Sequence, residues 1–156
     1  MKITDKWLEE KGACPEACDW IKEQDTRDLD TLTDLILKED DAEKYSWACW
    51  GLSRIFNQKQ KVRFSVYCAE KVLHIFEGKY PDDKRPREAI LAAKKWLKNP
   101  TQETAYATYA TGYAANAADA AAYAAAYATN AAFAADDKTK MYRKFVLYGR
   151  RILKEK

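Results

Sequence analysis

The feature that most constrains the fold is an alanine-rich stretch at residues 101–137, about half of which are alanine. Alanine has the highest helix propensity, so local preference alone predicts a helix. Tyrosines and asparagines recur there at alternating intervals of three and four residues, which places them in one stripe along a helix. The stripe consists of Tyr106, Tyr109, Tyr113, Asn116, Ala120, Tyr123, Tyr127 and Asn130. The neighbouring face is alanine, so we predict a long Ala/Tyr-rich amphipathic helix near the C-terminus, in which Gly112 alone favours a break.

The tyrosines of this stripe have two interpretations, which both stay open. Their rings pack on the core while their hydroxyls reach water, as is common for half-buried tyrosines. Alternatively they form a recognition surface, because tyrosine is enriched at interface hot spots. In that case the contact residues are Tyr106, Tyr109, Tyr113, Tyr123 and Tyr127. A membrane-spanning helix is excluded, since Tyr, Asn, Asp and Thr recur throughout the stretch.

Composition extends the helical prediction to the whole chain. Of its 156 residues, 33% are charged and 47% hydrophobic, which is typical of a globular protein. Only 5 glycines and 4 prolines are present, and no segment shows the alternation of period two that strands need. We therefore predict an all-α multi-helix bundle that forms a single domain over residues 1–156. Within it, residues 1–98 form core helices, 101–137 the alanine-rich helix and 138–156 a basic C-terminal helix.

Capping residues and apolar spacing predict the helix boundaries. The expected helices cover residues 3–11, 15–24, 29–38, 44–57, 61–77, 88–98 and 138–156. Thr4 or Asp5 caps the first helix, Gly12 ends it, and Asp28 caps the third. Gly78 is expected to end its helix in the left-handed conformation, and Asp83 to cap the next helix. The last helix is expected to direct outward the side chains of Lys140, Arg143, Lys144, Arg150 and Arg151.

Charge is distributed unevenly, although the net charge is only +3. Residues 1–44 hold 14 acidic and 7 basic side chains, whereas residues 138–156 hold 8 basic and 1 acidic. Such an arrangement either brings the two ends of the chain together or offers separate acidic and basic surfaces to partners. The basic end also permits a nucleic-acid-binding interpretation, in which the C-terminal helix follows the phosphates.

The sequence contains no recognisable catalytic constellation. It has no Gly-rich phosphate loop, and nothing near His74 indicates a nucleophile. The cysteines, Cys14, Cys18, Cys49 and Cys68, are expected to be free thiols rather than metal ligands. We therefore predict that the protein is not an enzyme and uses no metal, cofactor or small-molecule substrate. An enzyme would need the fold to gather carboxylates such as those of Asp19, Asp34 and Glu70.

The start of the chain predicts where the protein resides. Met1 is followed by Lys2, Thr4, Asp5 and Lys6 without the apolar run of a signal peptide. No later segment is apolar enough to span a bilayer. We therefore predict a cytoplasmic protein without a membrane partner.

A second distinctive stretch is the loop at residues 78–87, Gly-Lys-Tyr-Pro-Asp-Asp-Lys-Arg-Pro-Arg. Each residue there has a structural role, such as Tyr80 held extended before Pro81, or Pro86 in a first helical turn. The functional alternative is that a charged cluster in this loop contacts a partner, because opposite charges on a rigid loop suit recognition. The cluster consists of Asp82, Asp83, Arg85 and Arg87.

The segment from Val72 to Leu97, VLHIFEGKYPDDKRPREAILAAKKWL, resembles the signature of the Imm-5-like family of immunity proteins. The similarity lies in the Tyr-Pro-Asp-Asp loop followed by Arg-Pro-Arg-Glu-Ala-Ile. The segment ACPEACDWIKE is similar to an N-terminal pattern of the same family, here with Cys14, Glu16 and Trp20. The resemblance implies an all-helical protein that acts by binding, and phage-encoded relatives imply that its target is a toxin, a host enzyme or a defence system.

We therefore expect a protein-binding inhibitor, of an immunity or phage anti-defence type, that neutralises a toxin or host defence enzyme stoichiometrically. The alternative is a nucleic-acid-binding protein that uses the basic C-terminal helix. Neither the identity of the partner nor the oligomeric state follows from the sequence.

Overall fold

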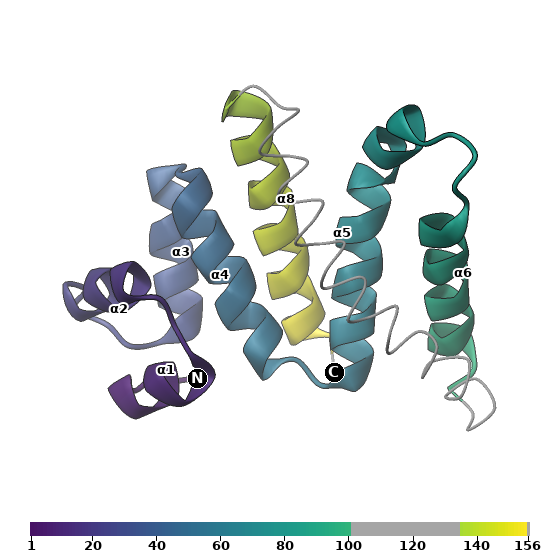
Figure 1. Cartoon of the computed structure of the whole chain (residues 1–156). Coiled ribbons are helices and arrows are strands. Elements are labelled where there is room, and N and C mark those ends of the chain that lie inside the picture. The colour runs from purple at the N-terminus through teal and green to yellow at the C-terminus, as the bar shows by residue number, and fades with distance from the viewer. Residues whose placement is uncertain (101–134, 156) are drawn as a thin grey trace. The chain divides into compact units, whose positions relative to one another are not determined.

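Figure 1 shows the computed structural model, which describes residues 1–100 and 135–155. In this part of the chain the helices are α1 (Asp5–Lys11), α2 (Pro15–Lys22), α3 (Leu29–Glu39), α4 (Ala42–Ile55), α5 (Gln58–Lys79), α6 (Arg85–Lys98) and α8 (Ala135–Lys154). The described residues form no strand, and an isolated bridge pairs Lys2 with Asp28. The all-α multi-helix prediction is confirmed. The predicted alanine-rich helix lies outside the described residues.

The chain divides into two compact units. One, here called the terminal unit, comprises Met1–Ile55 together with Asp136–Lys156. The other, the hairpin unit, comprises Phe56–Ala135. Helices α1 to α4 and α8 therefore belong to the terminal unit, while α5 and α6 belong to the hairpin unit. The organisation as a single domain stays a prediction.

Short polar residues determine where the helices of the terminal unit begin. The hydroxyl of Thr4 accepts the N–H of Trp7 at 3.1 Å, and the carboxylate of Asp28 accepts the N–H of Thr31 at 3.2 Å. These bonds satisfy N–H groups that have no partner within the first turn of a helix. Gly12 ends α1 with φ of 70°, a left-handed conformation that glycine adopts without strain. The predictions for these caps are confirmed.

Residues from distant parts of the sequence close the core of the terminal unit. Tyr45 and Leu52 on α4 are 0% exposed, as are Val146 and Ile152 on α8. Burying an aliphatic side chain of this size contributes roughly 1.5–3 kcal/mol. Helix α8 is therefore an integral part of this core, although α5 and α6 precede it in the chain.

The orientation predicted for Arg150 on α8 is wrong. Its side chain is only 16% exposed, and its guanidinium donates to the Asp34 carboxylate, with Asp30 3.9 Å away. The other four residues predicted to point outward, Lys140, Arg143, Lys144 and Arg151, are exposed, while Val146, Gly149 and Ile152 are buried. The acidic and basic ends of the chain thus meet through α3 and α8.

The hairpin unit contains α5 and α6, which lie side by side and antiparallel (Figure 1). Asn57 and Gln60 form a reciprocal capping box at the start of α5, with bonds of 2.9 and 3.0 Å. Burial of Val62 and Val66 on α5 against Ile90 on α6 forms the core. Around it pack the partly buried Ala69, Leu73, Ala93, Trp96 and Leu97.

The prediction that Gly78 ends its helix in the left-handed conformation is wrong. Helix α5 continues through Gly78 to Lys79, and the positive φ angles of the described chain belong to Gly12 and Asp40. The helix continues past Gly78 because Tyr80, two residues later, contacts Phe76 in the preceding turn. The N–H of Tyr80 donates to the carbonyl of Phe76 at 2.8 Å, and their ring centroids lie 5.1 Å apart.

Candidate functional site

The loop between α5 and α6 brings together the predicted site residues that the structure describes. Asp83 and Arg85 form a close ion pair, whereas Asp82 is exposed beside them. The loop turns tightly, because the N–H of Asp83 donates to the carbonyl of Tyr80 at 3.2 Å. The remaining predicted contact residues, Tyr106, Tyr109, Tyr113, Tyr123 and Tyr127, lie outside the described residues.

Asp83 is held by three donors from Arg85. Nε of Arg85 lies 2.9 Å from Oδ1, Nη2 lies 2.6 Å from Oδ2, and the backbone N–H reaches Oδ1 at 3.1 Å. Bidentate arginine–carboxylate pairs combine charge with fixed geometry. The side-chain hydrogen bonds from Arg85 lower the pKa of Asp83 to about 2, so its carboxylate stays charged at any physiological pH. The cap of α6 is Lys84 rather than Asp83, one residue later than predicted.

A second bidentate pair joins the two helices next to the loop. Nε and Nη2 of Arg87 donate to the two carboxylate oxygens of Glu77 at 2.7 and 2.6 Å. The hydrogen bonds from Arg87 lower the pKa of Glu77, and those to Glu77 raise the pKa of Arg87. Sequence reasoning missed Glu77. The available signal was an antiparallel helix pair, which places residues on either side of its loop within reach of each other.

Tyr80 gives the loop an apolar surface. Its side chain is 47% exposed, although it contacts Phe76, and the ammonium of Lys79 lies 5.3 Å from the centre of its ring. Tyrosine combines a large rigid apolar area with a polar tip, which suits it to interfaces. The loop therefore presents an exposed aromatic ring next to charges that are fixed in place.

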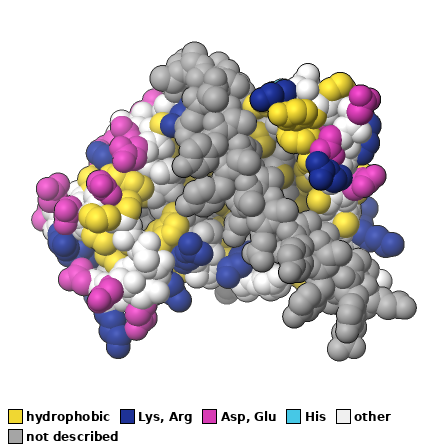
Figure 2. All heavy atoms as spheres, viewed as in Figure 1, with side chains coloured by type: hydrophobic (Ala, Val, Ile, Leu, Met, Phe, Trp, Pro, Cys, Tyr) yellow, Lys and Arg dark blue, Asp and Glu magenta, His cyan; other side chains and the backbone are white. Residues whose placement is uncertain are grey.

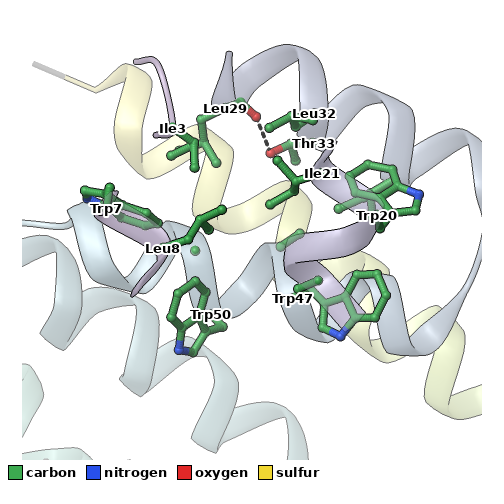
Figure 3. A pocket seen from close by; sticks show the side chains of 14 residues that line it. Ile3, Trp7, Leu8, Trp20, Ile21, Leu29, Leu32, Thr33, Trp47 and Trp50 are labelled. Atoms are coloured by element: carbon green, nitrogen blue, oxygen red, sulfur yellow. Dashed lines mark hydrogen bonds between the residues drawn. The ribbon is translucent and has the colours of Figure 1, made fainter. Parts of the chain in front are cut away.

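The terminal unit contains a small apolar cavity among α1 to α4, shown in Figure 3. Its lining includes Ile3, Trp7, Leu8, Trp20, Ile21, Leu29, Leu32, Thr33, Trp47 and Trp50. The ring centroids lie 5.9 Å apart for Trp7 and Trp50, and 6.4 Å apart for Trp20 and Trp47.

This cavity has neither the size nor the chemistry of a substrate site. Its volume is about 40 Å³, whereas ligand pockets typically enclose roughly 300–1,000 Å³. The hydroxyl of Thr33 is already used, because it donates to the carbonyl of Leu29 at 2.7 Å (Figure 3). The cavity is therefore a packing feature of an aromatic core.

The chemistry of the other candidate residues is equally limited. Within residues 1–100 and 135–155, no group of three or more His, Cys, Asp or Glu side chains could hold a metal ion. None of the four cysteines forms a disulfide bond, and all four lie in the described part of the chain. Burial raises the pKa of the thiols of Cys18 and Cys49, which makes them weak nucleophiles at neutral pH. Among the described helices, none is both long and apolar enough to cross a bilayer.

The described chain is thus an all-α protein whose most distinctive surface is an ion-paired loop between two antiparallel helices. A family model described as Imm-5 like putative immunity protein matches residues 52–154, more than half of the chain. The chain therefore belongs to this family. The matched region begins within α4 and includes the α5–α6 loop and α8. Neither the curated proteins nor the solved structures contain a match.

Proposed function

We propose that this protein is an immunity protein that neutralises a partner protein by stoichiometric binding. The partner is a toxin or a host enzyme, and a phage-encoded anti-defence inhibitor would act in the same way. Support comes from the family match, which includes the loop from Tyr80 to Arg87. No catalytic step is assigned to the protein, because inhibition by covering a partner requires only a complementary surface.

The observation that carries the proposal is the pre-organised loop. The Asp83–Arg85 and Glu77–Arg87 pairs fix its backbone and its charges before any partner arrives. Ordering a loop on binding costs free energy, so a loop that is already ordered binds more tightly for the same contacts. Tyr80 and Asp82 are then the residues that face the partner, and Asp83 and Arg85 hold them in position. The tyrosines at 106, 109, 113, 123 and 127 are further contact residues in this proposal.

Affinity capture from the native host tests this function. The tagged protein is expected to retain one protein in equimolar amount, which native mass spectrometry measures. A Tyr80→Ser, Asp82→Asn double variant is expected to lose most of that protein. The matched control is Asp25→Asn, since Asp25 is exposed in a loop of the terminal unit. Equal capture by both variants would contradict the role of the loop, and no equimolar protein with the wild type would contradict stoichiometric inhibition.

A second candidate function is nucleic-acid binding by α8. The observation that favours it is that Lys140, Arg143 and Lys144 are exposed along this helix. The ion pair of Arg150 with Asp34 removes one charge from that surface. Titration with labelled DNA and RNA at low ionic strength distinguishes the candidates, because phosphate contacts make binding steeply salt-dependent.

A further inference from the structure

The described part of the hairpin unit carries a surplus of positive charge. Residues 56–100 include 11 Lys or Arg and 5 Asp or Glu side chains. Three of these five carboxylates are already paired within the unit: Asp83 with Arg85, Glu77 with Arg87, and Glu70 with Lys94. The unit therefore has more cations than its described carboxylates pair with, and several of these cations are exposed.

Several of these cations lie in one stripe on α6. The residues of this stripe follow one another at alternating intervals of four and three, which places them on one side of the helix. They are Lys84, Glu88, Leu91, Lys95 and Lys98. All five are exposed, whereas Ile90 is buried against α5. Lys95 and Lys98 have no carboxylate partner among the described residues. The stripe is the outer face of α6.

Leu91 lies in the middle of this stripe and is 59% exposed. Most of this side chain is in contact with water, and a partner that covered it would remove that apolar surface from water. Tyr80, at the loop end of the same hairpin, is the other large hydrophobic residue exposed in the described hairpin unit. Figure 2 shows hydrophobic side chains at the surface over α5 and α6, next to both basic and acidic side chains. An apolar centre with a polar rim is the usual anatomy of a protein interface.

We infer that the outer face of α6 binds an acidic surface of the partner protein, with Leu91 entering an apolar site and Lys95 and Lys98 facing carboxylates. This inference rests on the proposed function and specifies the chemistry of the partner. A protein fits better than a nucleic acid, because Glu88 lies within the stripe and would repel phosphates, while Leu91 would meet no apolar surface on a phosphate backbone.

The test uses a defined probe instead of the native partner. The probe is a fluorescein-labelled synthetic helical peptide with one leucine stripe bordered by glutamates, and its affinity is measured by anisotropy at low ionic strength. Lys95→Glu with Lys98→Glu is expected to weaken binding about tenfold or more, as reversed charges at an interface do. Leu91→Gln is expected to weaken it about fivefold, as the loss of an apolar anchor does.

The matched control is Lys11→Glu with Lys38→Glu, which reverses two exposed charges in the terminal unit and changes the net charge equally. Its affinity is expected to stay within about twofold of the wild type, since charges outside an interface contribute little to binding. Circular dichroism establishes that each variant is folded.

Three results would overturn the inference. The first is equal loss of affinity in the control, and the second is equal binding of a peptide with lysines in place of the glutamates. The third is tighter binding of a short DNA duplex than of the acidic peptide, together with weaker binding of that duplex by the Lys95→Glu, Lys98→Glu variant. This result would make the outer face of α6 a nucleic-acid site. Because the host protein is absent from this assay, its outcome does not depend on the capture experiment.

Discussion

Tyr45 shows how a single polar atom is accommodated in the core of the terminal unit. Its side chain is fully buried, and its hydroxyl donates to Oδ1 of Asp40 at 2.7 Å. Asp40 follows α3 with φ of 53°, in the left-handed region that a non-glycine residue rarely adopts. The strained turn therefore places the Asp40 carboxylate next to a hydroxyl that α4 buries. Burial and this hydrogen bond raise the pKa of Tyr45 to about 12 from its ordinary value of 10.0.

Because the pKa of Tyr45 is raised on folding, the free energy of unfolding changes with pH in the alkaline range. The unfolded chain loses the Tyr45 proton near pH 10, while the folded chain keeps it until about pH 12. The stabilisation is therefore complete below pH 10 and is lost as the pH rises from 10 to 12. Tyr45→Phe is expected to lower the free energy of unfolding by about 1 kcal/mol at pH 8, through the lost hydrogen bond. Urea unfolding at several pH values is expected to show this difference shrinking above pH 10, and a constant difference would contradict the assignment.

At the scale of helices, the Glu77–Arg87 pair fastens the end of α5 to the start of α6. Glu77→Gln is expected to destabilise the hairpin slightly, because Arg87 is half exposed and solvent weakens the pair. The pKa of Glu77 is lowered, so its contribution is present above about pH 4.5, the ordinary value, and is lost as the pH falls through the folded value. Thermal unfolding followed by circular dichroism is expected to show a lower melting temperature for the variant at pH 7, and a smaller difference from the wild type at pH 3.

Asp82→Asn is the control for this experiment, since Asp82 lies in the same loop and is exposed. Its melting temperature is expected to follow the wild type at both pH values. If Glu77→Gln behaves like Asp82→Asn, then the pair does not fasten the helices.

Helix positions were largely predictable from the sequence, because the signals that set them are local. Thr4, Asp28 and Gly12 act within one turn of their own positions, and the structure has each as predicted. Asn57 was assigned to the end of a helix, although with Gln60 it starts the next one. At the candidate site, Asp83 and Arg85 were predictable together because they are two residues apart. The partner of Arg87 was not, since that contact depends on how two helices pack.

At the scale of the molecule, the terminal unit depends on a helix from the far end of the chain. Ile152→Ala removes buried volume from α8 and is expected to cost about 2–5 kcal/mol. Hydrogen exchange is expected to rise in α3 and α4, with much less change in α5 and α6. The control is Leu147→Ala on the same helix, because Leu147 is 46% exposed. Equal exchange in α5 and α6 would mean that the two units unfold together.

The membership of α8 in the terminal unit has a consequence for synthesis. A ribosome delivers α1 to α4 before α8, so these helices emerge while a helix of their own unit is still missing. The nascent chain must keep this incomplete unit from aggregating until α8 has been translated. A message truncated before α8 would therefore release a polypeptide that chaperones and proteases recognise, even though most of its helices are present.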